Sequence, residues 1–136
     1  MKYLFDTCVI SDFVKGDLNT IEKIKSTSPL QIGTSAITEY ELRYGLEKNS
    51  NLKRAIKDAV LGFLNDVVIL PFGSKESIAA SNIRASLEKA GTPIGAYDIL
   101  IASTAIANNL ILVTSNEREF ERIQGIQIEN WRYEER

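Results

Sequence analysis

Residues 95–113 read GAYDILIASTAIANNLILV. The first part, residues 95–108, is apolar nearly all round at helical spacing, which predicts a buried helix. The second part, residues 110–113, is a short apolar run that predicts a strand. A helix followed by a strand is the repeating unit of a parallel sheet that is covered on both faces.

The same alternation continues toward both ends of the chain. Further strands are expected at residues 2–5, 30–33, 67–70 and 126–128. Helices are expected from Val9 to a stop at Gly16, at residues 18–25, at 37–48 behind an N-cap at Ser35, at 52–64, from a cap at Ser74 to Ala90, and at 117–123. The predicted fold is α/β: a single domain over residues 1–136, built as a three-layer α/β/α sandwich with a central, mostly parallel sheet.

The composition of the 136 residues, 44% hydrophobic and 25% charged, is that of a globular protein and excludes disordered, collagen-like and disulfide-rich classes. The single cysteine, Cys8, cannot form an internal disulfide, and its apolar neighbours predict a small buried hydrophobe. No signal peptide is expected, and the longest weakly polar stretch falls short of the ~20 residues that span a bilayer. We therefore expect a cytoplasmic protein without membrane contact.

The chain contains no histidine. This excludes Ser-His-Asp and Cys-His catalytic sites, HExxH zinc sites and imidazole bases. Any catalysis has to use oxygen groups, and oxygen ligands suit hard cations such as Mg²⁺, Ca²⁺ and Mn²⁺. The net charge of −2 argues against a protein that coats nucleic acid nonspecifically, but it permits a nuclease, because bound divalent ions reverse the local charge of a carboxylate site.

Two aspartates are candidate ligand-binding residues, and one of them stands where a ligand of an α/β sheet would bind, beyond the carboxyl end of a strand. Asp6 follows the first strand directly, and the alternative role of its side chain is an N-cap for the next helix. Asp98 is the only charged residue between Lys89 and Glu117. An isolated buried carboxylate must neutralise, pair or bind a metal. The alternative for Asp98 is a favourable interaction with the helix dipole, worth about 0.3–1 kcal/mol.

Helix geometry separates Glu41 from its neighbour Glu39. Glu39, Arg43 and Glu47 are spaced four residues apart, so they are expected to form an exposed ladder of ion pairs. Glu41 shares the apolar face of the helix, where a carboxylate needs a partner. That partner is either a bound cation or a cationic side chain in a structural ion pair.

A further group of polar residues follows the strand at 110–113. It includes Asn116 and Glu119, for which the alternatives are a helix cap and an ion pair with Arg122. Asp12, Glu117 and Glu121 are expected to be solvated surface. Acidic residues from three separate strand–helix connections would then meet at one rim of the sheet, an arrangement that suits Mg²⁺ and in-line phosphodiester displacement.

The sequence resembles the PIN-domain family, and within it the VapC toxins, in four segments that span nearly the whole chain. Each segment is short, but their order and spacing make the resemblance specific. They are Tyr3-Leu4-Phe5-Asp6-Thr7, residues 35–45 (SAITEYELRYG), residues 91–98 (GTPIGAYD), and Val113 to Asn116 continuing through residues 119–122 to Asn130-Trp131.

The resemblance implies a ribonuclease in which Asp6, Glu41 and Asp98 hold Mg²⁺ or Mn²⁺ and the metal activates water to cleave RNA, leaving a 5′-phosphate and a 3′-hydroxyl. Many PIN domains have a fourth acid where this chain has Asn116, so Asn116 or Glu119 is expected to complete the site. The resemblance also implies that hydroxyls of Thr7 and Thr114 support the ligands and orient water.

The resemblance implies partners as well. The last two segments are most similar to the VapC branch that cleaves initiator tRNA, which makes tRNA the expected substrate. VapC-like proteins dimerise and are inhibited by a VapB antitoxin, for which the amphipathic stretch 53–64 is a candidate docking face; its alternative is a helix packed on the core. Arg43, Lys48 and Arg118 are candidate contacts to the RNA backbone.

The sequence also suggests two alternative functions. A noncatalytic PIN domain that binds RNA or a partner protein would account for Asn116 in place of an acid. A phosphoryl-transfer domain on a similar sheet, with Asp6 as nucleophile, is disfavoured because no second aspartate stands two residues later and no receiver-like lysine follows the last strands.

Overall fold

The computed structural model describes residues 1–49 and 51–132. At its centre is a sheet with strand order β3-β2-β1-β4-β5, in which all the described strand pairs are parallel. The strands are short: β1 (Tyr3–Phe5), β2 (Ile32–Ser35), β3 (Val68–Leu70), β4 (Ile111–Val113) and β5 (Ile128–Glu129). The predicted α/β sandwich is confirmed, and the described sheet is parallel throughout rather than mostly.

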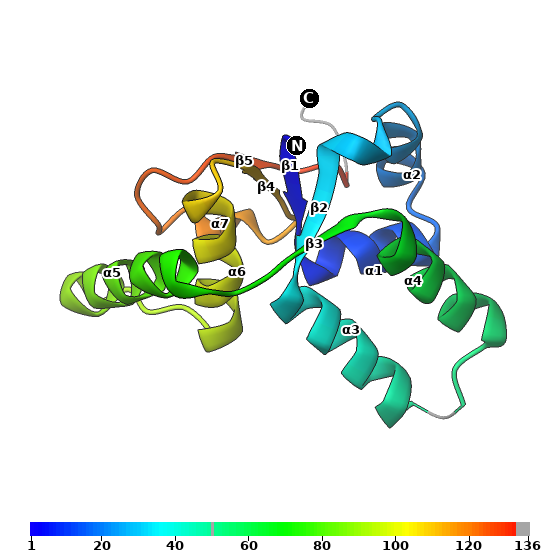
Figure 1. Ribbon diagram of the computed structural model, residues 1–136, viewed down its shortest axis with the longest axis horizontal. Helices are drawn as coiled ribbons and strands as arrows, with labels where there is room; N and C mark the ends of the chain where they lie inside the picture. The colour runs from blue at the N-terminus through cyan, green and yellow to red at the C-terminus, as the bar shows by residue number, and fades with distance from the viewer. Residues whose placement is uncertain (50, 133–136) are drawn as a thin grey trace.

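Helices cover both faces of the sheet (Figure 1). They are α1 (Thr7–Lys15), α2 (Leu18–Lys25), α3 (Ala36–Lys48), α4 (Arg54–Asp66), α5 (Ser74–Ala90), α6 (Ala96–Ala107) and α7 (Glu117–Phe120). Helices α5, α6 and α7 gather on one side, and α1, α2 and α4 lie on the other. In the part of the chain that the structure describes, no helix has the length and apolar character needed to cross a bilayer.

Alternation along the central strands divides the interior into two cores. Leu4 faces the α5–α6–α7 side and packs in the same cluster as Ile101 of α6, whereas Phe5 faces the opposite side. There the Phe5 ring stacks on Phe63 of α4 at 5.9 Å and meets Trp131 edge-on at 5.2 Å. Because successive side chains of a strand point to opposite faces, a strand covered on both sides needs an unbroken apolar run, as the sequence has here.

Several element boundaries differ from the sequence prediction for local reasons. The second strand begins at Ile32 rather than at residue 30, because residues Pro29–Gln31 form a 3₁₀ turn that leaves Leu30 exposed. Ser74 does not cap α5: Gly73 is the N-cap, and its backbone N–H donates to Glu76 Oε1 at 2.9 Å. The last helix ends at Phe120 rather than at 123, and the last strand is Ile128–Glu129.

Two predicted helix ends are confirmed. Ser35 caps α3 by accepting a hydrogen bond from the Thr38 backbone N–H at 3.0 Å. Gly16 ends α1 with φ +94°, a left-handed conformation that glycine adopts without strain.

The order of the strands reverses between β1 and β4. The chain leaves β1 through α1 and α2 toward β2 on one side, and it leaves β4 through α7 toward β5 on the other. Parallel sheets bind ligands in the crevice beyond the carboxyl ends of the strands at such a reversal point. Asp6 follows β1 and Thr114 follows β4, and the Asp6 backbone N–H donates to Val113 O at 3.2 Å. Asp6 and Thr114 therefore lie where a parallel sheet of this topology binds its ligands.

Candidate active site

Asp6 combines the two roles considered for it, a helix cap and a side chain at the sheet rim. Its Oδ1 accepts a hydrogen bond from the Val9 backbone N–H at 3.1 Å, so α1 begins at Thr7 instead of Val9. The side chain is almost fully buried. Burial raises the pKa of the Asp6 carboxyl, although hydrogen bonds from Cys8, Thr114 and Val9 oppose that rise.

Cys8 is not the inert hydrophobe that its neighbours predict. The thiol donates to both carboxylate oxygens of Asp6, with Sγ at 3.0 Å from Oδ1 and 3.1 Å from Oδ2, and the Ser115 hydroxyl donates to Sγ at 3.2 Å. Burial and the neighbouring charge of Asp6 raise the pKa of Cys8 to about 11. The residue is therefore a neutral hydrogen-bond donor that holds the Asp6 carboxylate.

Glu41 is held by a network of hydroxyl groups that joins α1 to α3. The Thr7 hydroxyl donates to Glu41 Oε1 at 2.7 Å and lies 3.5 Å from the Thr38 hydroxyl. The Ser35 hydroxyl in turn donates to Thr38 Oγ1 at 3.2 Å. Glu39 instead pairs with Arg43 Nε at 3.0 Å on the surface of α3, as predicted, whereas the expected continuation of this ladder to Glu47 does not form.

Asp98 and Glu119 meet at the start of α6, although they come from different connections of the fold. Glu119 Oε1 accepts a hydrogen bond from the Gly95 backbone N–H at 3.0 Å. Asp98 Oδ2 and Glu119 Oε1 would lie 3.5 and 3.7 Å from a β-carbon built on Gly95, so both carboxylates face this glycine. The two side chains also share a hydrogen bond.

The charges of the site act together on Asp98. Burial, the hydrogen bond and charge of Glu119, and the charges of Asp6 and Glu41 raise the pKa of Asp98 to about 7. The Gly95 N–H and the shared hydrogen bond lower the pKa of Glu119. Four carboxyl groups, from the residue after β1 and from α3, α6 and α7, therefore belong to one electrostatic unit.

Asn116 and Thr114 support this unit. The Asn116 amide nitrogen donates to Glu119 Oε2 at 3.0 Å, and the Asn116 backbone N–H donates to Thr114 Oγ1 at 2.9 Å. Asn116 is the N-cap residue of α7, but its side chain makes no capping hydrogen bond. Glu119 is thus the acidic side chain after β4 that contacts this unit, and Asn116 is hydrogen-bonded to it.

The chemistry of these donors suits a hard cation, because all of them are oxygen atoms. In residues 1–49 and 51–132, the ion pairs involve none of Asp6, Glu41, Asp98 or Glu119. Within this described part of the chain, the charge of Arg122 acts on Glu119 without forming an ion pair with it. As the described side chains stand, no three of them are gathered closely enough to enclose a metal ion. A divalent ion would have to draw the carboxylates together in order to be enclosed by them.

Sequence reasoning missed some features of this region. Asp12 is not solvated surface: its carboxylate is mostly covered, it lies 3.9 Å from Arg132 Nε, and its charge reaches Asp6. Among the candidate RNA contacts, Arg43 is engaged by Glu39, while Lys48 and Arg118 are exposed.

The sequence matches the PIN domain family over residues 3–126. The chain therefore belongs to the PIN-domain family, which confirms the resemblance seen in its motifs. It is 37% identical over 131 residues to the tRNA(fMet)-specific endonuclease VapC of Salmonella typhimurium, covering 96% of this chain and 98% of the relative. It is 30% identical, with the same coverage, to the protein of that name from Shigella flexneri.

Solved structures extend this similarity to three dimensions. The structure of DNA-bound VapBC from Salmonella typhimurium superposes with a TM-score of 0.85 at 36% identity, covering 96% of this chain and 98% of that one. VapBC2 from Rickettsia felis, bound to a promoter DNA fragment, gives a TM-score of 0.85 at 33% identity, with 96% and 99% coverage. The fold and the arrangement of its elements are those of VapC proteins.

Proposed function

We propose that this chain is the toxin of a type II toxin–antitoxin pair: a cytoplasmic, Mg²⁺- or Mn²⁺-dependent endoribonuclease whose substrate is initiator tRNA. The relatives named above are tRNA(fMet)-specific endonucleases, and the alignments cover nearly all of each protein. The related solved structures are complexes of VapB with VapC, which supports a VapB-like antitoxin as partner. Residues 1–136 would act as a single PIN domain, working as a homodimer.

The observation that carries the proposal is the set of acidic side chains whose charges act on Asp98. Asp6, Glu41 and Glu119 all act on this carboxyl, and their joint effect with burial is a pKa of about 7. We assign Asp6, Glu41 and Asp98 as metal ligands and Glu119 as the fourth acid, held in place by Asn116. A bound divalent ion would supply Lewis-acid activation of water and charge stabilisation at the cleaved phosphodiester.

The protein residues have distinct tasks in this scheme. Cys8 and the Val9 N–H hold the Asp6 carboxylate, and Thr7 holds Glu41, so two of the ligands are oriented before an ion arrives. Asp98 must lose its proton to bind a cation, and its raised pKa places that loss near neutral pH.

Cleavage of RNA by the purified chain tests the proposal. Initiator tRNA and total RNA are incubated with Mg²⁺, with Mn²⁺ or with a chelator, and the new ends are mapped. We expect cleavage of initiator tRNA with either ion, none with the chelator, and none by Asp98→Asn. Asp66→Asn, an exposed aspartate on α4, is the matched control and should cleave normally. Undiminished cleavage by Asp98→Asn would refute the assignment.

Binding of RNA without any cleavage would favour the second candidate, a noncatalytic PIN domain. Its motivation is Asn116, which stands where many family members have an acid. In the structure, however, Glu119 brings an acid to the same place, which favours catalysis.

A further inference from the structure

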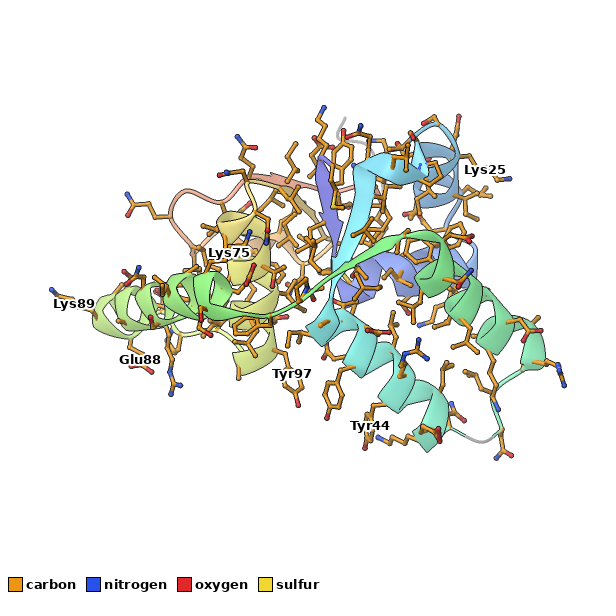
Figure 2. All side chains as sticks on the ribbon, in the orientation of Figure 1. Lys25, Tyr44, Lys75, Glu88, Lys89 and Tyr97 are labelled. Atoms are coloured by element: carbon orange, nitrogen blue, oxygen red, sulfur yellow. The ribbon has the colours of Figure 1, made fainter. Side chains whose placement is uncertain are left out.

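Three tyrosines form an exposed cluster beside the candidate site. Tyr40 and Tyr44 lie on α3 and Tyr97 lies at the start of α6, and their exposed fractions are 52%, 55% and 45%. Figure 2 shows Tyr44 and Tyr97 projecting on the same side of the molecule, away from the sheet. Aromatic rings are usually buried, and exposed aromatic patches commonly mark binding surfaces. We call these three residues the tyrosine patch.

The rings of the patch contact one another across two helices. Tyr40 and Tyr97 are 5.8 Å apart and meet edge to face at 79°, with their hydroxyl oxygens 3.5 Å apart. Tyr40 and Tyr44 are 6.4 Å apart and nearly parallel, at 23°. The contacts fix the rings relative to one another and leave about half of each residue open to solvent.

The patch is continuous with the carboxylate site. Tyr40 immediately precedes Glu41, and Tyr97 immediately precedes Asp98. Asp98 Oδ2 and Glu119 Oε1 both face Gly95, which lies two residues before Tyr97 at the start of α6. A ligand that lies on the patch would therefore reach the carboxylates directly.

A cation stands at the far end of the patch. Lys48 Nζ lies 5.9 Å from the centre of the Tyr44 ring, near the end of α3. Lys48 makes no ion pair in the part of the chain that the structure describes. Ring faces suit nucleobases and a free ammonium suits a phosphate, which is the combination that single-strand-binding proteins use.

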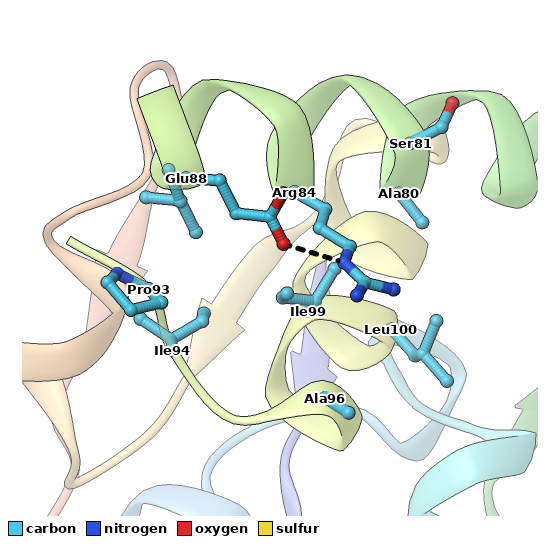
Figure 3. Close-up of a pocket in the computed structure, with 10 residues that line it drawn as sticks. Ala80, Ser81, Arg84, Glu88, Pro93, Ile94, Ala96, Ile99 and Leu100 are labelled. Carbon is cyan, nitrogen blue, oxygen red and sulfur yellow. Dashed lines mark hydrogen bonds and ion pairs between the residues drawn. The ribbon is translucent and has the colours of Figure 1, made fainter. Parts of the chain in front are cut away.

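An apolar hollow elsewhere on the molecule does not compete with this patch. It lies between α5 and the start of α6, holds about 500 Å³, and has the Arg84–Glu88 ion pair at its rim (Figure 3). Its walls are mainly apolar, and nothing in the structure indicates what would cover it.

We propose that Tyr40, Tyr44 and Tyr97, with Lys48, form a subsite that stacks unpaired bases of single-stranded RNA and leads the strand to the carboxylates. This inference rests on the proposed ribonuclease function and specifies what the substrate must look like near the cut. The subsite would select an unpaired loop over a duplex, because bases inside a duplex cannot stack on protein rings.

Binding in the presence of a chelator tests the subsite without cleavage. The probe is a fluorescent single-stranded RNA oligonucleotide of mixed sequence, compared with the same sequence as a duplex. We expect Tyr40→Ala and Tyr97→Ala to weaken single-strand binding roughly 5- to 160-fold, the range for losing one stacked base. Tyr40→Phe and Tyr97→Phe keep the ring and should bind within about twofold of the unaltered protein. Leu18→Ala, an exposed apolar residue on α2, is the control.

Steady-state cleavage separates failure of the subsite from failure of the proposed function. If the unaltered chain cleaves RNA and the alanine variants raise KM while kcat stays nearly constant, the subsite is supported, because stacking stabilises bound substrate and transition state alike. Unchanged KM and unchanged binding in both alanine variants would overturn it. Altered oligomeric state together with lost binding would overturn it too, since the patch would then be a contact between copies. If the chain cleaves no RNA with any divalent ion, the proposed ribonuclease function is refuted. The binding comparison in the chelator would still show whether the tyrosine patch binds single-stranded RNA.

Discussion

The Thr7 hydroxyl donates a 2.7 Å hydrogen bond to Glu41 Oε1. These residues are 34 positions apart, and the bond connects the first turn of α1 with the middle of α3. A carboxylate that is oriented before it binds an ion pays less entropy on binding. We therefore expect the Thr7 hydroxyl to orient Glu41 for the proposed metal ion, although the hydroxyl is neither acidic nor basic.

Replacing Thr7 with valine removes this hydrogen bond and keeps the volume of the side chain. Loss of a group that orients a metal ligand commonly costs 10- to 100-fold in metal affinity or activity. We expect Thr7→Val to need about tenfold more Mg²⁺ for half-maximal cleavage. Thr7→Ser retains the hydroxyl and should behave like the unaltered chain. Equal Mg²⁺ requirements for the valine and serine variants would show that the bond is incidental.

Glu119→Gln tests the coupling between Glu119 and Asp98. The glutamine oxygen can still accept from the Gly95 N–H, but the negative charge is gone. Because the charge and hydrogen bond of Glu119 help to raise the pKa of Asp98, we expect that pKa to fall below 7 in the variant. Carboxyl NMR titration of metal-free protein measures it. Glu121→Gln, on the exposed surface one residue after α7, should leave it unchanged.

The pKa of Asp98 also predicts a pH dependence of stability without metal. The folded chain holds this proton more tightly than the unfolded chain, whose aspartates have the ordinary value of 3.8. The protonated Asp98 carboxyl thus contributes fully to the free energy of unfolding below about pH 4, and this contribution is lost as the pH rises toward 7. In the presence of a chelator, the Tm of the unaltered chain should fall as the pH rises from about 4 toward 7. The Tm of Asp98→Asn should fall less over the same pH range. Parallel Tm curves for both proteins would contradict the raised pKa.

Divalent ions should stabilise the folded chain more strongly at high pH than at low pH. They bind the deprotonated carboxylate, so the rise in Tm on adding Mg²⁺ should be larger at pH 8 than at pH 6. A larger rise at the lower pH would be inconsistent with carboxylate ligands.

Ser35→Ala tests the local framework of α3. The Ser35 hydroxyl is buried, accepts from the Thr38 N–H at 3.0 Å and donates to Thr38 Oγ1. Removing such an N-cap costs roughly 0.5–2 kcal/mol of the free energy of unfolding. Urea denaturation measures the loss. Ser26→Ala, at the exposed end of α2, should change the free energy of unfolding by less than about 0.5 kcal/mol.

The main elements of the fold follow from the sequence because their signals are local. Apolar runs such as residues 110–113 place strands, and Gly16 and Ser35 place helix ends. The errors occur where a tertiary or turn preference prevails over the apolar pattern. Leu30 extends an apolar run, but Pro29 starts a 3₁₀ turn that excludes it from the sheet. Ser74 is a good cap residue, but the reach of Glu76 to the Gly73 N–H moves the helix start.

The candidate site was less accessible from sequence alone. Asp98 is conspicuous because its surroundings carry no charge, and Glu41 because it lies on an apolar face. The hydrogen bonds around the site are not conspicuous. No sequence pattern indicates that a thiol is hydrogen-bonded to Asp6 or that an asparagine is hydrogen-bonded to Glu119. The tyrosine patch is equally hidden, because Tyr40 and Tyr97 meet only through the packing of α3 on α6.

Glu41 and Glu39 offer the sharpest comparison, because they are two residues apart on α3 and differ only in their surroundings. Mn²⁺ binding, followed by electron paramagnetic resonance at pH 8, would be compared for Glu41→Gln, Glu39→Gln and the unaltered chain. We predict that Glu39→Gln binds Mn²⁺ as the unaltered chain does and that Glu41→Gln binds at least about tenfold more weakly. Equal binding by all three proteins would contradict a carboxylate-held ion in this chain.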